Sequence, residues 1–190
     1  MCRVQSVMAA TLLTLACSIA AVSCAKDSPA SPSGAGDNGT PSAIASDEAL
    51  FTLISQTQPF RSYTPFPKLD TSAAGTLTAS SAHQPVVRVS MNAVAASALS
   101  NGSLPSGALF PDGSVIFKEV LGTNGAVNLC AVMNKDRRNT LAGNGWLWAE
   151  LRPGGGADYS VRNRGSACTG CHALARGPEN DFVRIFERQR

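Results

Sequence analysis

The chain has 190 residues, of which 44% are hydrophobic and only 15% are charged. This length fits one domain, because compact domains mostly contain about 100 to 200 residues. A formal net charge of +3 on scattered basic residues argues against nucleic-acid binding, which requires a dense basic surface. The six cysteines are too few for a disulfide scaffold, so their positions must carry the information.

Residues 1–23 have the features of a secretory signal peptide, because a positive charge at Arg3 precedes an apolar run too short to span a bilayer comfortably. The run ends in Ala-Val-Ser before Cys24, which is similar to the lipobox at which bacterial lipoproteins are cleaved and acylated. We therefore expect a protein on the periplasmic side of the bacterial envelope, lipid-anchored through Cys24. The alternative is ordinary cleavage after Ala25, which would release a soluble periplasmic protein.

Residues 24–46 are dominated by Ala, Ser, Pro and Gly and contain no aromatic residue. Such a segment cannot bury enough apolar surface to offset the entropy lost on ordering. The sequence thus predicts a disordered linker over 24–46 and a single folded domain over 47–190.

The first predicted elements of the domain are helices and a strand. Two acids followed by apolar residues at helical spacing predict a helix over 47–54, capped by Ser46 or Asp47. Alternating β-branched residues predict a strand over 86–91. Residues 92–99 then have a helical pattern that ends at an Asn-Gly pair.

Turn signals separate three further predicted strands, over 114–121, 127–133 and 146–151. Short strands joined by turns pair antiparallel. The expected fold is therefore α+β, a mainly antiparallel β-sheet with a few flanking helices. Within the last strand, Trp146 and Trp148 are expected on the same face.

The strongest motif in the chain is CTGCH over residues 168–172. Two thiols at this spacing can each bond a haem vinyl group, while the adjacent imidazole reaches the iron. We predict one covalently bound haem c, attached through Cys168 and Cys171, with His172 as the axial iron ligand. The alternatives are a disulfide or redox-active pair, and a zinc site whose further ligands would come from His172, Cys130 or His83.

The sixth iron ligand would decide between electron transfer and small-molecule chemistry. Met91 and Met133 lie in apolar strands, where core packing is the usual role of methionine. His83 lies in a polar segment and is expected in solvent. We therefore expect an open distal site, with a six-coordinate electron-transfer cytochrome as the alternative.

Five segments, in the same order over about residues 86–183, resemble the cytochrome P460 family, which includes the cytochromes c′-β: VVRVSMNAVAASAL, LFPDGSVIFKEVL, AVMNKD, GWLWAEL and CTGCHALARGPENDFV. The resemblance implies a mainly antiparallel β fold around one haem c. It also implies a five-coordinate iron, bound by the motif histidine, that binds nitric oxide or oxidises hydroxylamine. The expected function is an exported mono-haem cytochrome that binds nitric oxide or a related small nitrogen species.

In P460 cytochromes a lysine is bonded to the haem edge, and Lys118 matches that position by motif. The alternative is that Lys118 and Glu119 end a strand as a surface ion pair, which contributes little. For hydroxylamine oxidation the resemblance implies a distal carboxylate, and residues 127–146 offer only Asp136, in a polar turn. An apolar distal wall would instead favour nitric oxide, with Phe117 as a steric cap.

Roles are also expected for two further residues and for two protein partners. Arg88 alternates with two valines, so it faces either a haem propionate or solvent. Cys130, in an apolar strand, is expected to be buried in the core. A redox partner protein would exchange electrons with the haem, and the resemblance together with an exposed sheet edge would allow a homodimer.

Overall fold

The computed structural model describes residues 44–69, 73–74, 82–174 and 176–189. The predicted signal peptide, Cys24 and most of the predicted linker therefore lie outside the described residues. Among the residues that are described, no helix combines the length and apolar character needed to cross a membrane.

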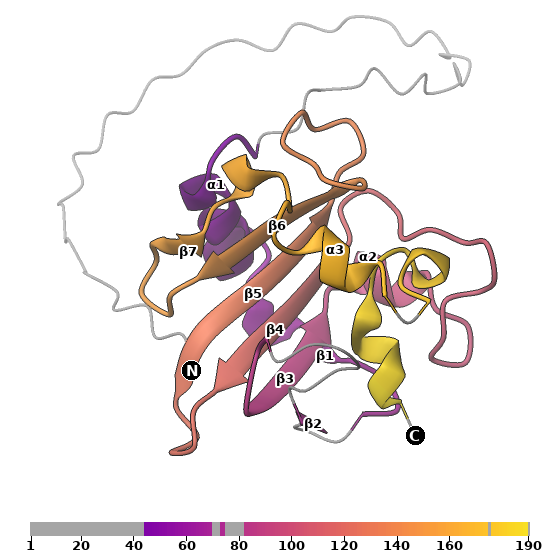
Figure 1. Cartoon of the computed structure of the whole chain (residues 1–190), viewed down its shortest axis with the longest axis horizontal. Coiled ribbons are helices and arrows are strands. Elements are labelled where there is room, and N and C mark those ends of the chain that lie inside the picture. The colour runs from indigo at the N-terminus through magenta and orange to yellow at the C-terminus, as the bar shows by residue number, and fades with distance from the viewer. Residues whose placement is uncertain (1–43, 70–72, 75–81, 175, 190) are drawn as a thin grey trace, which may run out of the picture. The chain divides into compact units, whose positions relative to one another are not determined.

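The fold is α+β, as predicted, with one antiparallel sheet and short helical elements around it (Figure 1). In sheet order the strands are β1 (Thr64–Pro65), β3 (Val86–Met91), β4 (Val115–Leu121), β5 (Val127–Lys135), β6 (Trp146–Leu151) and β7 (Ala157–Tyr159), and β2 (Ala73–Ala74) also pairs with β3. The helical elements are α1 (Asp47–Thr52), η1 (Leu53–Thr57), η2 (Phe60–Ser62), α2 (Ala93–Ser97), η3 (Val161–Asn163), α3 (Thr169–His172), η4 (Pro178–Asn180) and η5 (Arg184–Arg188).

The predicted elements agree closely with the structure. Strands β3 and β6 have the predicted bounds, and Ser46 caps α1 by accepting a hydrogen bond from the Ala49 amide at 3.2 Å. Strand β5 continues two residues beyond its predicted end, because its pairing with β6 extends to Lys135. The short edge strand β7 was not predicted, since it lies in a glycine-rich stretch without an alternating pattern.

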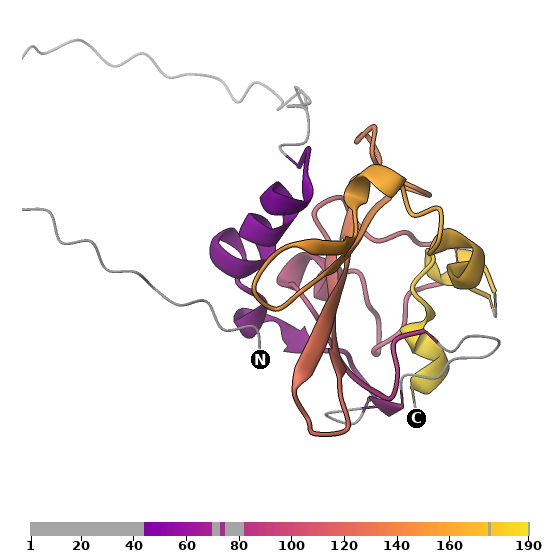
Figure 2. The ribbon, with the colours of Figure 1, turned by 60° about the vertical axis from the view of Figure 1, so that its left-hand side comes forward.

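The two faces of the sheet support two separate cores. Trp146 and Trp148 are buried on one face, as predicted, and Leu147 is buried on the other. Cys130 belongs to the core on the Leu147 face, which confirms its expected burial. Figure 2 shows α1 on one side of the sheet and the C-terminal elements on the other. The C-terminal segment that carries the CTGCH motif therefore packs on the tryptophan face.

Candidate functional site

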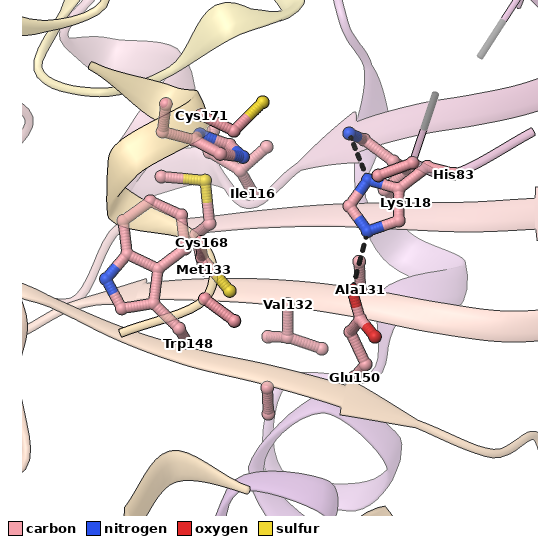
Figure 3. Close-up of a pocket in the computed structure, with 14 residues that line it drawn as sticks. His83, Ile116, Lys118, Ala131, Val132, Met133, Trp148, Glu150, Cys168 and Cys171 are labelled. Carbon is pink, nitrogen blue, oxygen red and sulfur yellow. Dashed lines mark hydrogen bonds and ion pairs between the residues drawn. The ribbon is translucent and has the colours of Figure 1, made fainter. Parts of the chain in front are cut away.

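A pocket opens between the CTGCH segment and the strands β4, β5 and β6 (Figure 3). The space inside it, counted together with its open mouth, is about 680 Å³. The motif residues Cys168, Cys171 and His172 line one part of it. Figure 3 shows His83, Lys118 and Glu150 together in another part, away from the motif helix.

The short helix α3 brings the three motif side chains together. Its first turn is closed by a hydrogen bond of 2.9 Å from the His172 amide to the Cys168 carbonyl. Residues three and four apart lie on the same face of a helix, so both cysteines and His172 can reach one ligand. Cys168 and Cys171 are both free thiols.

One ring nitrogen of His172 is engaged in a hydrogen bond. Its Nδ1 donates to the Phe182 carbonyl at 2.6 Å, which leaves Nε2 with a lone pair. The Trp148 ring contacts the imidazole edge-to-face, with centroids 4.7 Å apart. Burial, assisted by the positive charge of Lys118, lowers the pKa of His172 to about 4. The imidazole is therefore neutral at neutral pH, which is the form that ligates a metal.

The other interpretations of the motif fit these residues less well. Burial, followed by the nearby Glu150 carboxylate, raises the pKa of Cys168 to about 11, whereas redox-active cysteines have a lowered pKa. Over the described ranges, no group of three or more His, Cys, Asp or Glu side chains is arranged to hold a metal ion, so zinc has no support. Two thiols, a neutral imidazole with a free Nε2 and an adjoining pocket fit a haem c instead.

Lys118, His83 and Glu150 form a hydrogen-bonded chain along the pocket (Figure 3). Lys118 Nζ lies 3.3 Å from His83 Nδ1, and His83 Nε2 lies 2.8 Å from Glu150 Oε1. Because a carboxylate can only accept, His83 donates through Nε2 and accepts from the Lys118 ammonium through Nδ1. Burial lowers the pKa of Lys118 to about 8, although the Cys171 thiol and the Glu150 carboxylate oppose the shift.

Strand alternation separates Lys118 from two residues expected near the haem. Phe117 lies on the opposite face of β4, where it stacks on Phe60 with ring centroids 4.5 Å apart, so its expected role as a cap is wrong. Arg88 also lies outside the pocket lining and pairs with Glu119 at 2.9 Å. Glu119 is therefore the partner of Arg88, and Lys118 does not end its strand as a surface ion pair.

The three candidate sixth ligands lie in different parts of the fold. His83 was expected in solvent, but its side chain is only 16% exposed and both ring nitrogens have partners. Met91 is buried in the core and does not line the pocket. Met133 lines the pocket beside Trp148, its cross-strand partner, near the motif cysteines (Figure 3).

The pocket contains a carboxylate that the sequence analysis missed. Asp136 stays in its turn, where its Oδ1 accepts from the Arg138 amide at 3.3 Å, and it does not line the pocket. Glu150 lines the pocket instead, four residues beyond the segment 127–146. The signal was present, since Glu150 follows Trp148 by two residues and so shares its face of β6. The expectation of an apolar wall is corrected accordingly.

Comparison with protein-family models places the chain in a known family. The protein-family model described as Cytochrome P460 matches residues 70–184. The matched segment includes β2 to β7, the motif helix α3, and all three residues of the Lys118–His83–Glu150 chain. No curated protein matches the chain.

Proposed function

Because the chain belongs to the cytochrome P460 family and is therefore a haem c-binding cytochrome, we propose that it binds a small nitrogen species at an open face of one haem. In this proposal Cys168 and Cys171 form the thioether bonds and His172 ligates the iron. The free thiols and the neutral imidazole beside the pocket support this assignment.

The observation that carries the proposal further is the Lys118–His83–Glu150 chain in the pocket wall. These groups offer hydrogen-bond donors and acceptors to a polar ligand, and each electron removed from hydroxylamine is accompanied by a proton that needs an acceptor. Oxidation of hydroxylamine is therefore the function that the pocket supports best. Electron transfer is favoured less, because His83 is engaged at both nitrogens and Met91 does not line the pocket, which leaves Met133 as the remaining candidate for a sixth ligand.

Each polar residue of the pocket has a definite role in this proposal. When bound, the haem would supply an iron able to bind the ligand and to accept electrons. Glu150 accepts protons and, with its side chain 29% exposed, passes them to solvent. His83 orients the Glu150 carboxylate through Nε2–H. Lys118 is the candidate for a haem cross-link, because a pKa of about 8 gives it more neutral, nucleophilic amine than an ordinary lysine has.

Binding of nitric oxide without oxidation is the second candidate function. It is favoured by the apolar part of the lining on the pocket face of the sheet, which suits a small neutral diatomic molecule and includes Ile116, Ala131 and Met133. For both candidates we propose the location expected from the sequence, the periplasmic side of the cell envelope with a lipid anchor at Cys24. A redox partner protein would remove the electrons that hydroxylamine oxidation delivers to the haem, and a homodimer remains an expectation.

Full-length protein matured in the periplasm tests the proposal. A pyridine haemochrome assay should give the spectrum of one covalently bound haem c. With an artificial electron acceptor, Glu150→Gln should lower the rate of hydroxylamine oxidation about 100-fold, because general bases typically contribute 10²- to 10⁴-fold. The matched control is Glu119→Gln, the same change on the opposite face of the sheet, which should leave the rate unchanged.

Three results would point elsewhere. Absence of covalent haem would remove the proposal altogether. A wild-type protein that binds nitric oxide but does not oxidise hydroxylamine would establish the second candidate. A low-spin ferrous spectrum that does not respond to nitric oxide or carbon monoxide would identify an electron carrier.

A further inference from the structure

The segment after η4 has an unusual backbone beside His172. Asp181 and Phe182 are consecutive non-glycine residues in the left-handed region, with φ of 50° and 65°. This region is uncommon for side chains other than Asn, Asp or His, and a bulky aromatic residue there is an outlier. Such a conformation persists only where the surrounding structure over-determines it.

The contacts of Asp181 provide that support. Its Oδ1 accepts from Lys135 Nζ at 2.7 Å, and the two side chains are only 3% and 2% exposed. Its Oδ2 accepts from the Phe110 amide at 2.9 Å, and its carbonyl accepts from Trp146 Nε1 at 2.8 Å. These three contacts tie the turn to buried residues of other segments.

The turn held in this way carries the group that contacts His172. The Phe182 carbonyl accepts the Nδ1 proton of His172 at 2.6 Å. Two residues later, Arg184 donates to the Cys171 carbonyl at 2.9 Å, so the same segment also contacts the second motif cysteine. Gly177 permits the close approach, because a Cβ there would overlap the His172 carbonyl.

Stability alone does not account for the Lys135–Asp181 ion pair. Taking two charges out of water is expensive, and well-packed apolar residues of similar volume are often as stabilising. Lys135 lies at the end of β5, with Nζ 4.8 Å from the Trp146 ring centroid, so its ammonium is fixed on both sides. The pair thus forms a rigid link from the sheet to the turn that contacts His172.

We propose that Lys135 and Asp181 are positioning residues for the axial ligand: they hold the Phe182 carbonyl on His172 Nδ1, which fixes the tautomer with Nε2 free and strengthens the imidazole as a donor. Outer partners of ligating histidines orient the ring and raise its basicity. A stronger donor favours the ferric state, so the pair sets the reduction potential. The inference rests on His172 as iron ligand in the proposed function, and not on hydroxylamine as substrate.

The test uses full-length holoprotein with Lys135→Met, Asp181→Asn and the double variant. Weakening the hydrogen bond should lower the iron–histidine stretching frequency in resonance Raman spectra of the ferrous protein. It should also shift the ferric–ferrous equilibrium about tenfold toward ferrous, which is about 59 mV for one electron. The double variant leaves no unpaired buried charge, so it should recover stability while both shifts persist.

Leu50→Ala is the control, because Leu50 is buried in the core on the opposite face of the sheet. It should lower the melting temperature without changing the potential or the stretching frequency. A native potential and frequency in the double variant would overturn the inference, and so would equal shifts in Leu50→Ala.

A further variant keeps the test decisive if Lys135→Met yields no holoprotein. Trp146→Phe preserves the ion pair but removes the hydrogen bond to the Asp181 carbonyl, and a smaller shift in the same direction is expected. Unchanged spectra and potential would overturn the inference. Absence of covalent haem in the wild-type protein would instead count against the proposed function.

Discussion

The protonation and the hydrogen bonds of single residues in the pocket depend on partners that lie far away in the sequence. His172 is neutral because it is buried and lies near the positive charge of Lys118. Lys118 in turn contacts His83, and His83 contacts Glu150, which comes 67 residues later. Only the motif cysteines and histidine have a role that their own spacing predicts.

The burial of His172 makes the stability of the haem-free chain depend on pH. Its folded pKa of about 4 lies below the ordinary value of 6.5, so between these values the unfolded state binds a proton that the folded state does not. Stability is therefore complete above about pH 6.5 and falls as the pH drops toward 4. We expect a loss of roughly 1–2 kcal/mol between pH 7 and 4.5, allowing for solvent screening.

Urea unfolding of the haem-free variant Cys168→Ser/Cys171→Ser, followed by tryptophan fluorescence, measures this loss. Adding His172→Gln removes the titrating group and should reduce the pH dependence over this interval. An equal pH dependence with and without His172 would assign the loss to other groups.

At the scale of elements, strand β4 divides its side chains between structure and function. Ile116 and Lys118 line the pocket, while Phe117 and Glu119 face the other way. The period of two in a strand requires this division, so Phe117 and Lys118 could not both line one pocket. The apolar residues next to Lys118 in the sequence did not indicate which face of β4 lines the pocket.

Two substitutions in β4 should therefore affect different properties, one the stability of the fold and the other the pocket. Phe117→Ala should cost about 3–5 kcal/mol of stability, as for buried aromatic residues in general, with little effect on ligand affinity. Lys118→Met should change the haem spectrum if the cross-link exists, and should change hydroxylamine oxidation, with a smaller effect on stability. Urea unfolding measures the stability, absorption spectra report the cross-link, and ligand titration measures the affinity.

The outcome for Phe117 decides whether it contacts the ligand. A stable Phe117→Leu variant with strongly altered nitric oxide affinity would place this residue near the haem after all. An unchanged spectrum in Lys118→Met would remove the cross-link.

At the scale of the whole molecule, the two faces of the sheet have different roles. One side packs α1 into a closed apolar core, and the other carries the pocket beneath the C-terminal segment. The motif lies near the end of the chain, so α3 is added to a sheet whose strands precede it in sequence. The expected lipid anchor lies at the opposite end of the chain, before the linker.

The lipid anchor is tested in the full chain. Cys24→Ser should move the protein from the membrane fraction to the soluble periplasmic fraction, because acylation requires the thiol. Mass spectrometry of the wild-type N-terminus should show acyl groups on Cys24. A wild-type protein that is soluble and begins after Ala25 would establish ordinary signal-peptidase cleavage instead.

The sequence by itself determined the local features of this protein. Alternating β-branched residues and turn residues placed four strands within one or two residues of their ends, since these signals act over a few neighbours. The CTGCH spacing predicted a haem c site, because both thiols and the imidazole come from adjacent residues. Membership of the cytochrome P460 family was likewise evident from the order of short motifs.

Only the tertiary structure decided which distant groups share the pocket. His83 comes from the segment before β3 and Glu150 from β6, and the folding of the sheet brings them to Lys118. The link from Lys135 through Asp181 to His172 also depends on contacts across the fold. Such contacts leave no local pattern, because the free energy that selects them comes from burial and pairing between segments far apart in the chain.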